Sequence, residues 1–136
     1  MKRRLLLVYQ LLTGLSDTST GILLLVAPAV TLQLMRLHVP LQALPFISYV
    51  GVFVLSVGVA CLYGALLVMR NGAPQKLETV WLLTAITRGL VTLFVLAKIL
   101  SGGLETGWIT VALTDGAFAV LQSIGLMRGW LDDVNP

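Results

Sequence analysis

Three ionisable residues lie near the middle of otherwise apolar stretches of the sequence: Asp17, Arg88 and Asp115. A charge at the centre of a membrane-spanning helix costs about 2.5 to 3.5 kcal/mol on insertion scales, so such groups are expected to meet one another or water. The planar guanidinium group of Arg88 has five donors and can bridge two carboxylates at once. We therefore expect Arg88 to lie between Asp17 and Asp115 near the membrane midplane, in an Asp–Arg–Asp cluster.

Other polar residues are expected to share the faces that carry these charges. At 100° per residue, each of the three helices places its charge and further polar side chains on one stripe, which is about 80° wide on the first helix. The predicted hydrogen-bonding shell of the cluster consists of Gln10, Thr13, Thr84 and Gln122. Two interpretations stay open: a structural network that fixes the helix register, or a site that binds a ligand or a proton.

The composition is typical of a protein whose solvent is lipid. Of 136 residues, 57% are hydrophobic and only 11% are charged, and the mean hydropathy is +0.95. Four segments approach the length of about 20 residues that a helix needs to cross a bilayer: residues 5–27, 46–68, 80–100 and 107–127. These segments predict an all-α integral membrane protein, an antiparallel four-helix transmembrane bundle that forms a single domain over residues 1–136.

Basic residues flank the predicted spans, which accounts for most of the net charge of +3. They do not form a patch with interleaved aromatic residues, so we expect no nucleic-acid partner. By the positive-inside rule, both termini are predicted to be cytoplasmic, in a multi-pass protein of the cell inner membrane. A cleaved signal peptide is a weaker interpretation of the first segment, because Gln10, Thr13 and Asp17 interrupt its apolar run.

The second segment carries no charge and has two different faces. Gly51, Gly58 and Ala65 recur every seven residues on one face, which predicts close packing against a helix of this chain or of another protein. Tyr49 and Tyr63 recur on nearly the opposite face. These two tyrosines are candidate ligand contacts, although packing is the simpler interpretation.

Residue patterns that bind metals or cofactors are missing from the sequence. The single histidine, His38, lies in a predicted loop and has no partner at metal-ligand spacing. His38 is a candidate ligand contact for a haem or chlorophyll, but an ordinary surface histidine is the simpler interpretation. We predict no metal and no cofactor. Trp81, Trp108 and Trp130 fall near predicted span ends, which is typical of membrane-interface anchors.

The segment from Thr20 to Pro28, with Gly51 and Gly58 in the next span, resembles small four-span bacterial membrane proteins of the DoxX-like kind. The resemblance covers about the first half of the chain. It implies a four-helix fold, and some members of that group are similar to subunits that serve quinone-linked oxidoreductases.

Three functions are consistent with the sequence. We expect a non-catalytic accessory or assembly subunit of a larger redox or photosynthetic membrane complex, whose partners are lipid and either other membrane subunits or further copies in a homo-oligomer. The alternative is a protein that binds or transports a hydrophobic small molecule or a proton through the Asp–Arg–Asp cluster. A small membrane enzyme, which would need an accessible and unpaired carboxylate, is the third interpretation.

Overall fold

The structure, a computed structural model, describes residues 3–132 of the chain. Within this range the ordered elements are all helical and no strand occurs, which confirms the predicted all-α class. The five helices are α1 (Arg3–Val26), α2 (Pro28–Leu34), α3 (Leu44–Met69), α4 (Pro74–Leu100) and α5 (Ile109–Met127), and short 3-10 turns η1 (Leu41–Ala43) and η2 (Thr106–Trp108) precede α3 and α5.

Three of the helical segments are long and apolar enough to cross a membrane: Leu41–Met69, Pro74–Leu100 and Thr106–Met127. The first helix is not among them, although the sequence predicted a span at residues 5–27. α1 has the length of a span, with 24 residues. Its composition is less apolar, because the polar run from Ser16 to Thr20 and two further polar residues interrupt it.

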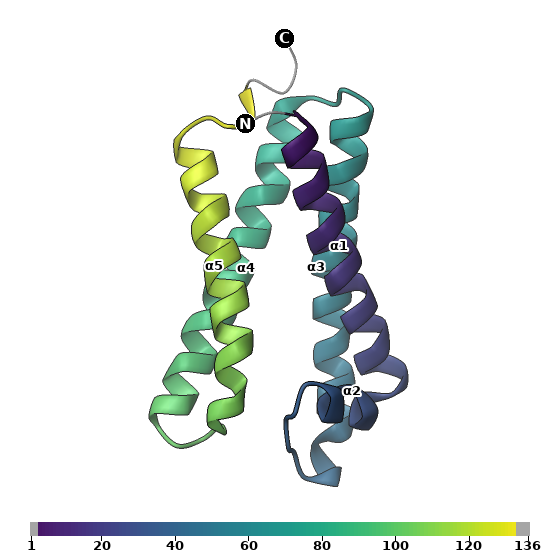
Figure 1. Ribbon diagram of the computed structural model, residues 1–136, viewed down its shortest axis with the longest axis vertical. Helices are drawn as coiled ribbons and strands as arrows, with labels where there is room; N and C mark the ends of the chain where they lie inside the picture. Colours follow the sequence, from purple (N-terminus) through teal and green to yellow (C-terminus); the bar gives the residue numbers. More distant parts are fainter. Residues whose placement is uncertain (1–2, 133–136) are drawn as a thin grey trace.

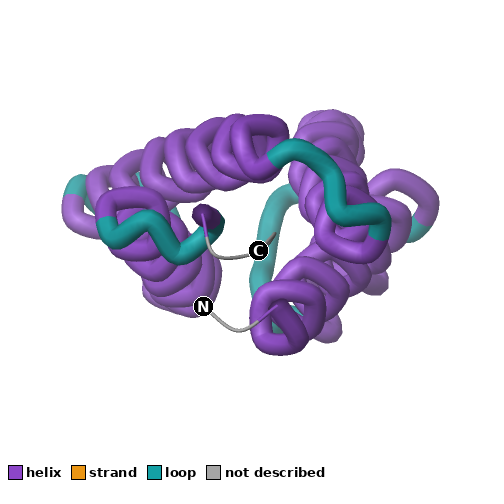
Figure 2. The backbone as a smooth tube through the Cα atoms, turned by 90° about the horizontal axis from the view of Figure 1, so that it is seen from above, coloured by secondary structure: helices purple, strands orange, loops and turns teal. Residues whose placement is uncertain are grey.

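The long helices form two antiparallel pairs. α1 packs along α3, and α5 packs along α4, whereas the two pairs touch mainly through α3 and α4. Figure 1 shows the pairs side by side, and the view from above in Figure 2 shows α1 and α5 standing apart. α1 begins and α5 ends at the same end of the bundle, here called the terminal end; α2 lies at the opposite end, here called the α2 end.

The small-residue face of α3 packs against α1. Gly58 lies against the backbone of Asp17 and Thr18, and a Cβ atom built on Gly51 would come within 2.8 Å of the Leu24 Cβ. α1 contributes Gly21, where an added Cβ would lie 2.5 Å from the backbone nitrogen of Leu55. The partner of this α3 face, which the sequence left open, is therefore a helix of the same chain.

The helix α4 begins six residues before the span predicted at residues 80–100. α4 starts at Pro74, whose ring suits the first turn of a helix, directly after a turn in which Asn71 has a φ of 52°. Trp81 therefore lies two turns inside α4 and is fully buried. The prediction that Trp81 anchors the chain at the membrane interface is wrong.

The terminal end of the bundle is closed by an apolar core. Its buried residues are Leu6, Val68, Leu77, Trp81 and Leu131, and they join α1, α3 and α4 to the segment after α5. Towards the α2 end the two pairs diverge (Figure 1). The predicted loop between the first two spans contains α2, and its Leu37 approaches Gly107 of η2 across this end.

Candidate functional site

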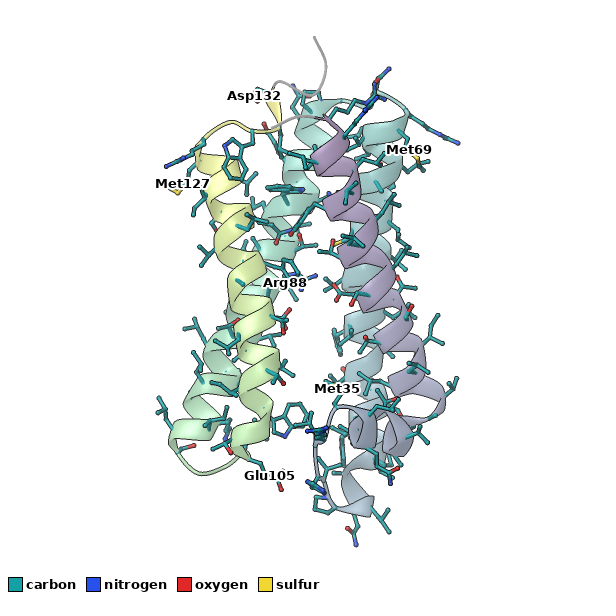
Figure 3. All side chains as sticks on the ribbon, viewed as in Figure 1. Met35, Met69, Arg88, Glu105, Met127 and Asp132 are labelled. Atoms are coloured by element: carbon teal, nitrogen blue, oxygen red, sulfur yellow. The ribbon has the colours of Figure 1, made fainter. Side chains whose placement is uncertain are left out.

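Arg88 of α4 joins the two helix pairs near the middle of the bundle. Its Nη1 donates a hydrogen bond to Asp115 Oδ1 on α5 at 2.7 Å, and its Nη2 donates to Asp17 Oδ2 on α1. Figure 3 shows the Arg88 side chain reaching from α4 into the space between the pairs. The structure thus brings Asp17, Arg88 and Asp115 into one cluster, in which each guanidinium arm binds a different carboxylate.

The three charges of the cluster differ in exposure. The Arg88 side chain is 4% exposed, whereas those of Asp17 and Asp115 are 21% and 22% exposed. The guanidinium carbon also lies 5.0 Å from the centre of the Phe118 ring, within the range of a cation–π contact. The cation is therefore enclosed, and the two carboxylates remain partly accessible.

Each carboxylate uses one oxygen for Arg88 and keeps the other free. Among residues 3–132, Asp17 Oδ1 and Asp115 Oδ2 have no hydrogen-bond partner. With all three groups ionised, two negative charges face one positive charge. The cluster can therefore accept a cation or a hydrogen-bond donor on its exposed side.

The four residues predicted as a shell do not hydrogen-bond to the cluster. Gln122 Nε2 donates to Thr84 Oγ1 at 2.8 Å, and the Thr13 hydroxyl donates to the carbonyl of Tyr9 on its own helix. Both amide atoms of Gln10 are buried without a partner among the described residues. The prediction fails for a geometric reason: these side chains lie one or two turns along the helices from the charges, beyond hydrogen-bond reach.

The three candidate ligand contacts lie away from the cluster. Tyr49 and Tyr63 are exposed on the outer face of α3, and Tyr49 stacks edge-on against Phe53 with ring centres 5.0 Å apart. His38 is exposed between α2 and α3, with its Nδ1 3.6 Å from Glu105 Oε2. A ligand at Arg88 would therefore not contact these residues in this arrangement.

Sequence reasoning missed two aromatic residues that pack near Arg88, Tyr9 and Phe118. The Tyr9 ring lies 5.4 Å from the Trp81 ring and 5.9 Å from the Phe118 ring, so these three residues connect α1, α4 and α5. Phe118 follows Asp115 by three positions and Tyr9 precedes Thr13 by four, which places each near the polar stripe of its helix. This spacing was the feature of the sequence that could have indicated that Tyr9 and Phe118 lie near the cluster.

Comparisons with models of protein families, with curated proteins and with solved structures found no match for this chain. The resemblance of residues 20–28 to DoxX-like proteins therefore stays a prediction. The geometry of the cluster is what remains as a guide to function.

Proposed function

We propose that this chain is a four-span membrane protein that binds a positively charged ligand, either a proton or the cationic head group of a small amphiphile, at the Asp–Arg–Asp cluster. The observation that carries this proposal is the difference in exposure between the two carboxylates and Arg88. A network that served only to hold helices together would gain nothing from carboxylate oxygens left without a partner.

The proposal treats α1 as the fourth span. At about 1.5 Å per residue, its 24 residues extend about 36 Å, which exceeds a hydrocarbon core of about 30 Å. Its exposed face is largely apolar, with Leu5, Val8, Leu12 and Leu15 pointing away from the bundle. Gln10 and Thr13 are buried and Asp17 faces Arg88, so these three polar residues are turned inwards rather than towards lipid, whereas Ser16 and Ser19 are exposed.

The chemistry of the cluster favours a cation over an anion. The side that remains accessible presents carboxylate oxygens, while Arg88 is enclosed behind them. A ligand with two or more N–H donors can bridge Asp17 Oδ1 and Asp115 Oδ2, and a proton can bind to either. The head group of an amphiphile would reach these oxygens on the side where the two carboxylates are 21% and 22% exposed.

Carboxyl-specific labelling tests whether the site is accessible. The full-length protein in bilayers is treated with an apolar carbodiimide, and the modified residues are identified by peptide mass spectrometry. We expect the carbodiimide to modify Asp17 or Asp115 in the wild-type protein. The modification at position 17 should be missing from Asp17→Asn, and that at position 115 from Asp115→Asn. Asp132 outside the helices, treated with a water-soluble carbodiimide, is the control for reactivity. Two unreactive cluster carboxylates would contradict the proposal.

Native mass spectrometry in a mild detergent then separates the two ligands. A bound amphiphile adds a defined mass to the wild-type protein, and this mass should be missing from the Asp17→Asn/Asp115→Asn variant. Carbodiimide labelling without an added mass indicates a proton site. An added mass that persists unchanged in the variant would show that the molecule binds elsewhere.

A role as an accessory subunit is the second candidate, and a groove between α3 and α4 favours it. Its lining includes Ser56 and Ala60 of α3 and Leu83 and Thr87 of α4. Small and hydroxyl-bearing side chains suit the close approach of another helix in a membrane. Stoichiometric protein partners in the same native mass spectra, lost on Ala60→Phe but kept in the Asp17→Asn/Asp115→Asn variant, would support this role.

A further inference from the structure

Each charge of the Asp–Arg–Asp cluster has a buried polar residue seven positions away on its own helix, towards the terminal end. These residues are Gln10 on α1, Trp81 on α4 and Gln122 on α5, and all three have an exposure of 0%. Seven residues are two helical turns, or about 10.5 Å. Gln10, Trp81 and Gln122 therefore form a second polar layer of the bundle, parallel to the cluster.

Side-chain contacts connect this second polar layer across all four long helices. The Trp81 ring packs against Tyr9 of α1, with ring centres 5.4 Å apart, and against Gly125 of α5. The amide group of Gln10 fills the space beside Gly64 of α3, where an added Cβ would collide with it. The second polar layer is thus part of the closed half of the molecule.

Several polar atoms of this layer lack a partner. Both amide atoms of Gln10, the indole nitrogen of Trp81 and Gln122 Oε1 are buried without a hydrogen bond to any described residue, as are the neighbouring Tyr9 hydroxyl and Arg88 Nε. Native proteins rarely leave such atoms unsatisfied, because each loses its bonds to water and gains none in return.

The orientation of Gln122 is fixed by its neighbour. The Thr84 hydroxyl donates to the carbonyl of Val80 at 2.7 Å, so it can only accept from Gln122. Gln122 must therefore present its NH2 group to Thr84 and its oxygen to the layer. Turning the amide round would break this bond and would not supply the missing partner.

We propose that the second polar layer binds ordered water molecules. The unpartnered groups include donors, at Trp81 Nε1, Arg88 Nε and Gln10 Nε2, and acceptors, at Gln10 Oε1 and Gln122 Oε1. Water supplies both kinds of partner, whereas an apolar ligand supplies neither. Leu6, Val68, Leu77 and Leu131 seal this region towards the terminal end. The hydrated region therefore extends about two turns from the cluster and stops there.

Hydration of this layer does not depend on a ligand at the cluster, so it is tested separately. Water-edited solid-state NMR of the full-length 15N-labelled protein in bilayers measures magnetisation transfer from water to the indole N–H of Trp81 and the side-chain NH2 of Gln10. Trp81→Phe and Gln10→Leu identify the two signals by their loss. Backbone amides of Leu6 and Leu77, in the apolar core next to the layer, provide the dry reference.

We expect transfer to Trp81 and Gln10 at least threefold above that to Leu6 and Leu77. Equal transfer would overturn the proposal. The unfolding midpoint of Gln10→Met, compared with that of the wild-type protein, provides an independent check. If water molecules bond to the Gln10 amide, the substitution removes those hydrogen bonds and the unfolding midpoint should fall. If the interior is dry, the substitution removes two unsatisfied polar atoms and the unfolding midpoint should rise. Leu12→Met on the exposed face of α1 is the matched control, and a higher midpoint for Gln10→Met would contradict a hydrated layer.

Discussion

Replacement of Arg88 by leucine should destabilise the protein more than replacement of all three charges of the cluster. Arg88 donates one charge-assisted hydrogen bond to each carboxylate, and such bonds contribute about 1.5 to 3 kcal/mol each. Removal of one partner from a buried ion pair costs about 3 to 5 kcal/mol. Because Asp17 and Asp115 retain 21% and 22% exposure, we expect the lower end of this range, about 3 kcal/mol.

The triple variant Arg88→Leu/Asp17→Asn/Asp115→Asn removes the two carboxylates that the single change leaves without a counter-charge. Neutral amides are less costly to bury, so its loss should be about 1 to 2 kcal/mol, and the coupling between the sites about 1 kcal/mol or more. Stability is measured in mild detergent by titration with a denaturing detergent, followed by far-UV circular dichroism. Arg128→Leu, at an exposed position after α5, controls for the loss of one positive charge.

A single variant as stable as the triple variant would refute this reasoning. It would mean that Arg88 does not neutralise the carboxylates in the folded protein, whatever the distances between the atoms. A triple variant that fails to fold while the single variant folds would contradict it equally, because the order of stability would be reversed.

Three further predictions use the same titration. Gly21→Leu should lower the free energy of unfolding by about 2 to 3 kcal/mol, because the new side chain would force α1 away from Leu55. Gly89→Ala should be neutral or stabilising by about 0.5 kcal/mol, because an added Cβ there meets no atom within 4 Å. Equal effects of the two variants would argue against the α1–α3 contact. Arg3→Ala should cost about 1 kcal/mol, since Arg3 Nη2 donates to the carbonyl of Val68 at 2.9 Å at the end of α3; an unchanged midpoint would show that this contact contributes nothing. Glu105→Gln should change stability by less than about 0.5 kcal/mol, because its pair with His38 is exposed; a larger loss would mean that the pair holds the α2 end together.

The helical class and the meeting of the three charges could be predicted because each follows from a strong constraint. Length and hydropathy limit the long segments to helices, and the cost of an isolated charge in lipid requires Asp17, Arg88 and Asp115 to find partners. The heptad spacing of Gly51 and Gly58 also predicted close packing. The spacing could not identify the helix that packs against this face of α3. Gly14 and Gly21 on α1 complete the α1–α3 interface only when the two helices are in the correct register.

The prediction of a hydrogen-bonding shell around the cluster failed because helical periodicity gives the direction of a side chain around the helix axis but not its position along that axis. Gln10 and Gln122 lie on the stripes that carry Asp17 and Asp115, as the sequence suggested, but two turns away along the axis. The wrong prediction for Trp81 also arose from a position along the helix axis that the sequence pattern did not give. Its helix begins at Pro74 rather than near residue 80, so a residue expected at the membrane interface lies inside the bundle.

The geometry of the cluster favours a binding role over a purely structural one. A network that only fixed the helix register would be expected to enclose its carboxylates as fully as its cation, since each unsatisfied oxygen weakens the network. Here Arg88 is enclosed by Phe118 and by its two partners, whereas each carboxylate keeps one oxygen and about a fifth of its surface free. Buried ion pairs can often be replaced by apolar residues without loss of stability. Stability alone therefore does not account for charges placed in this way, and we propose that binding of a cation at their exposed side does.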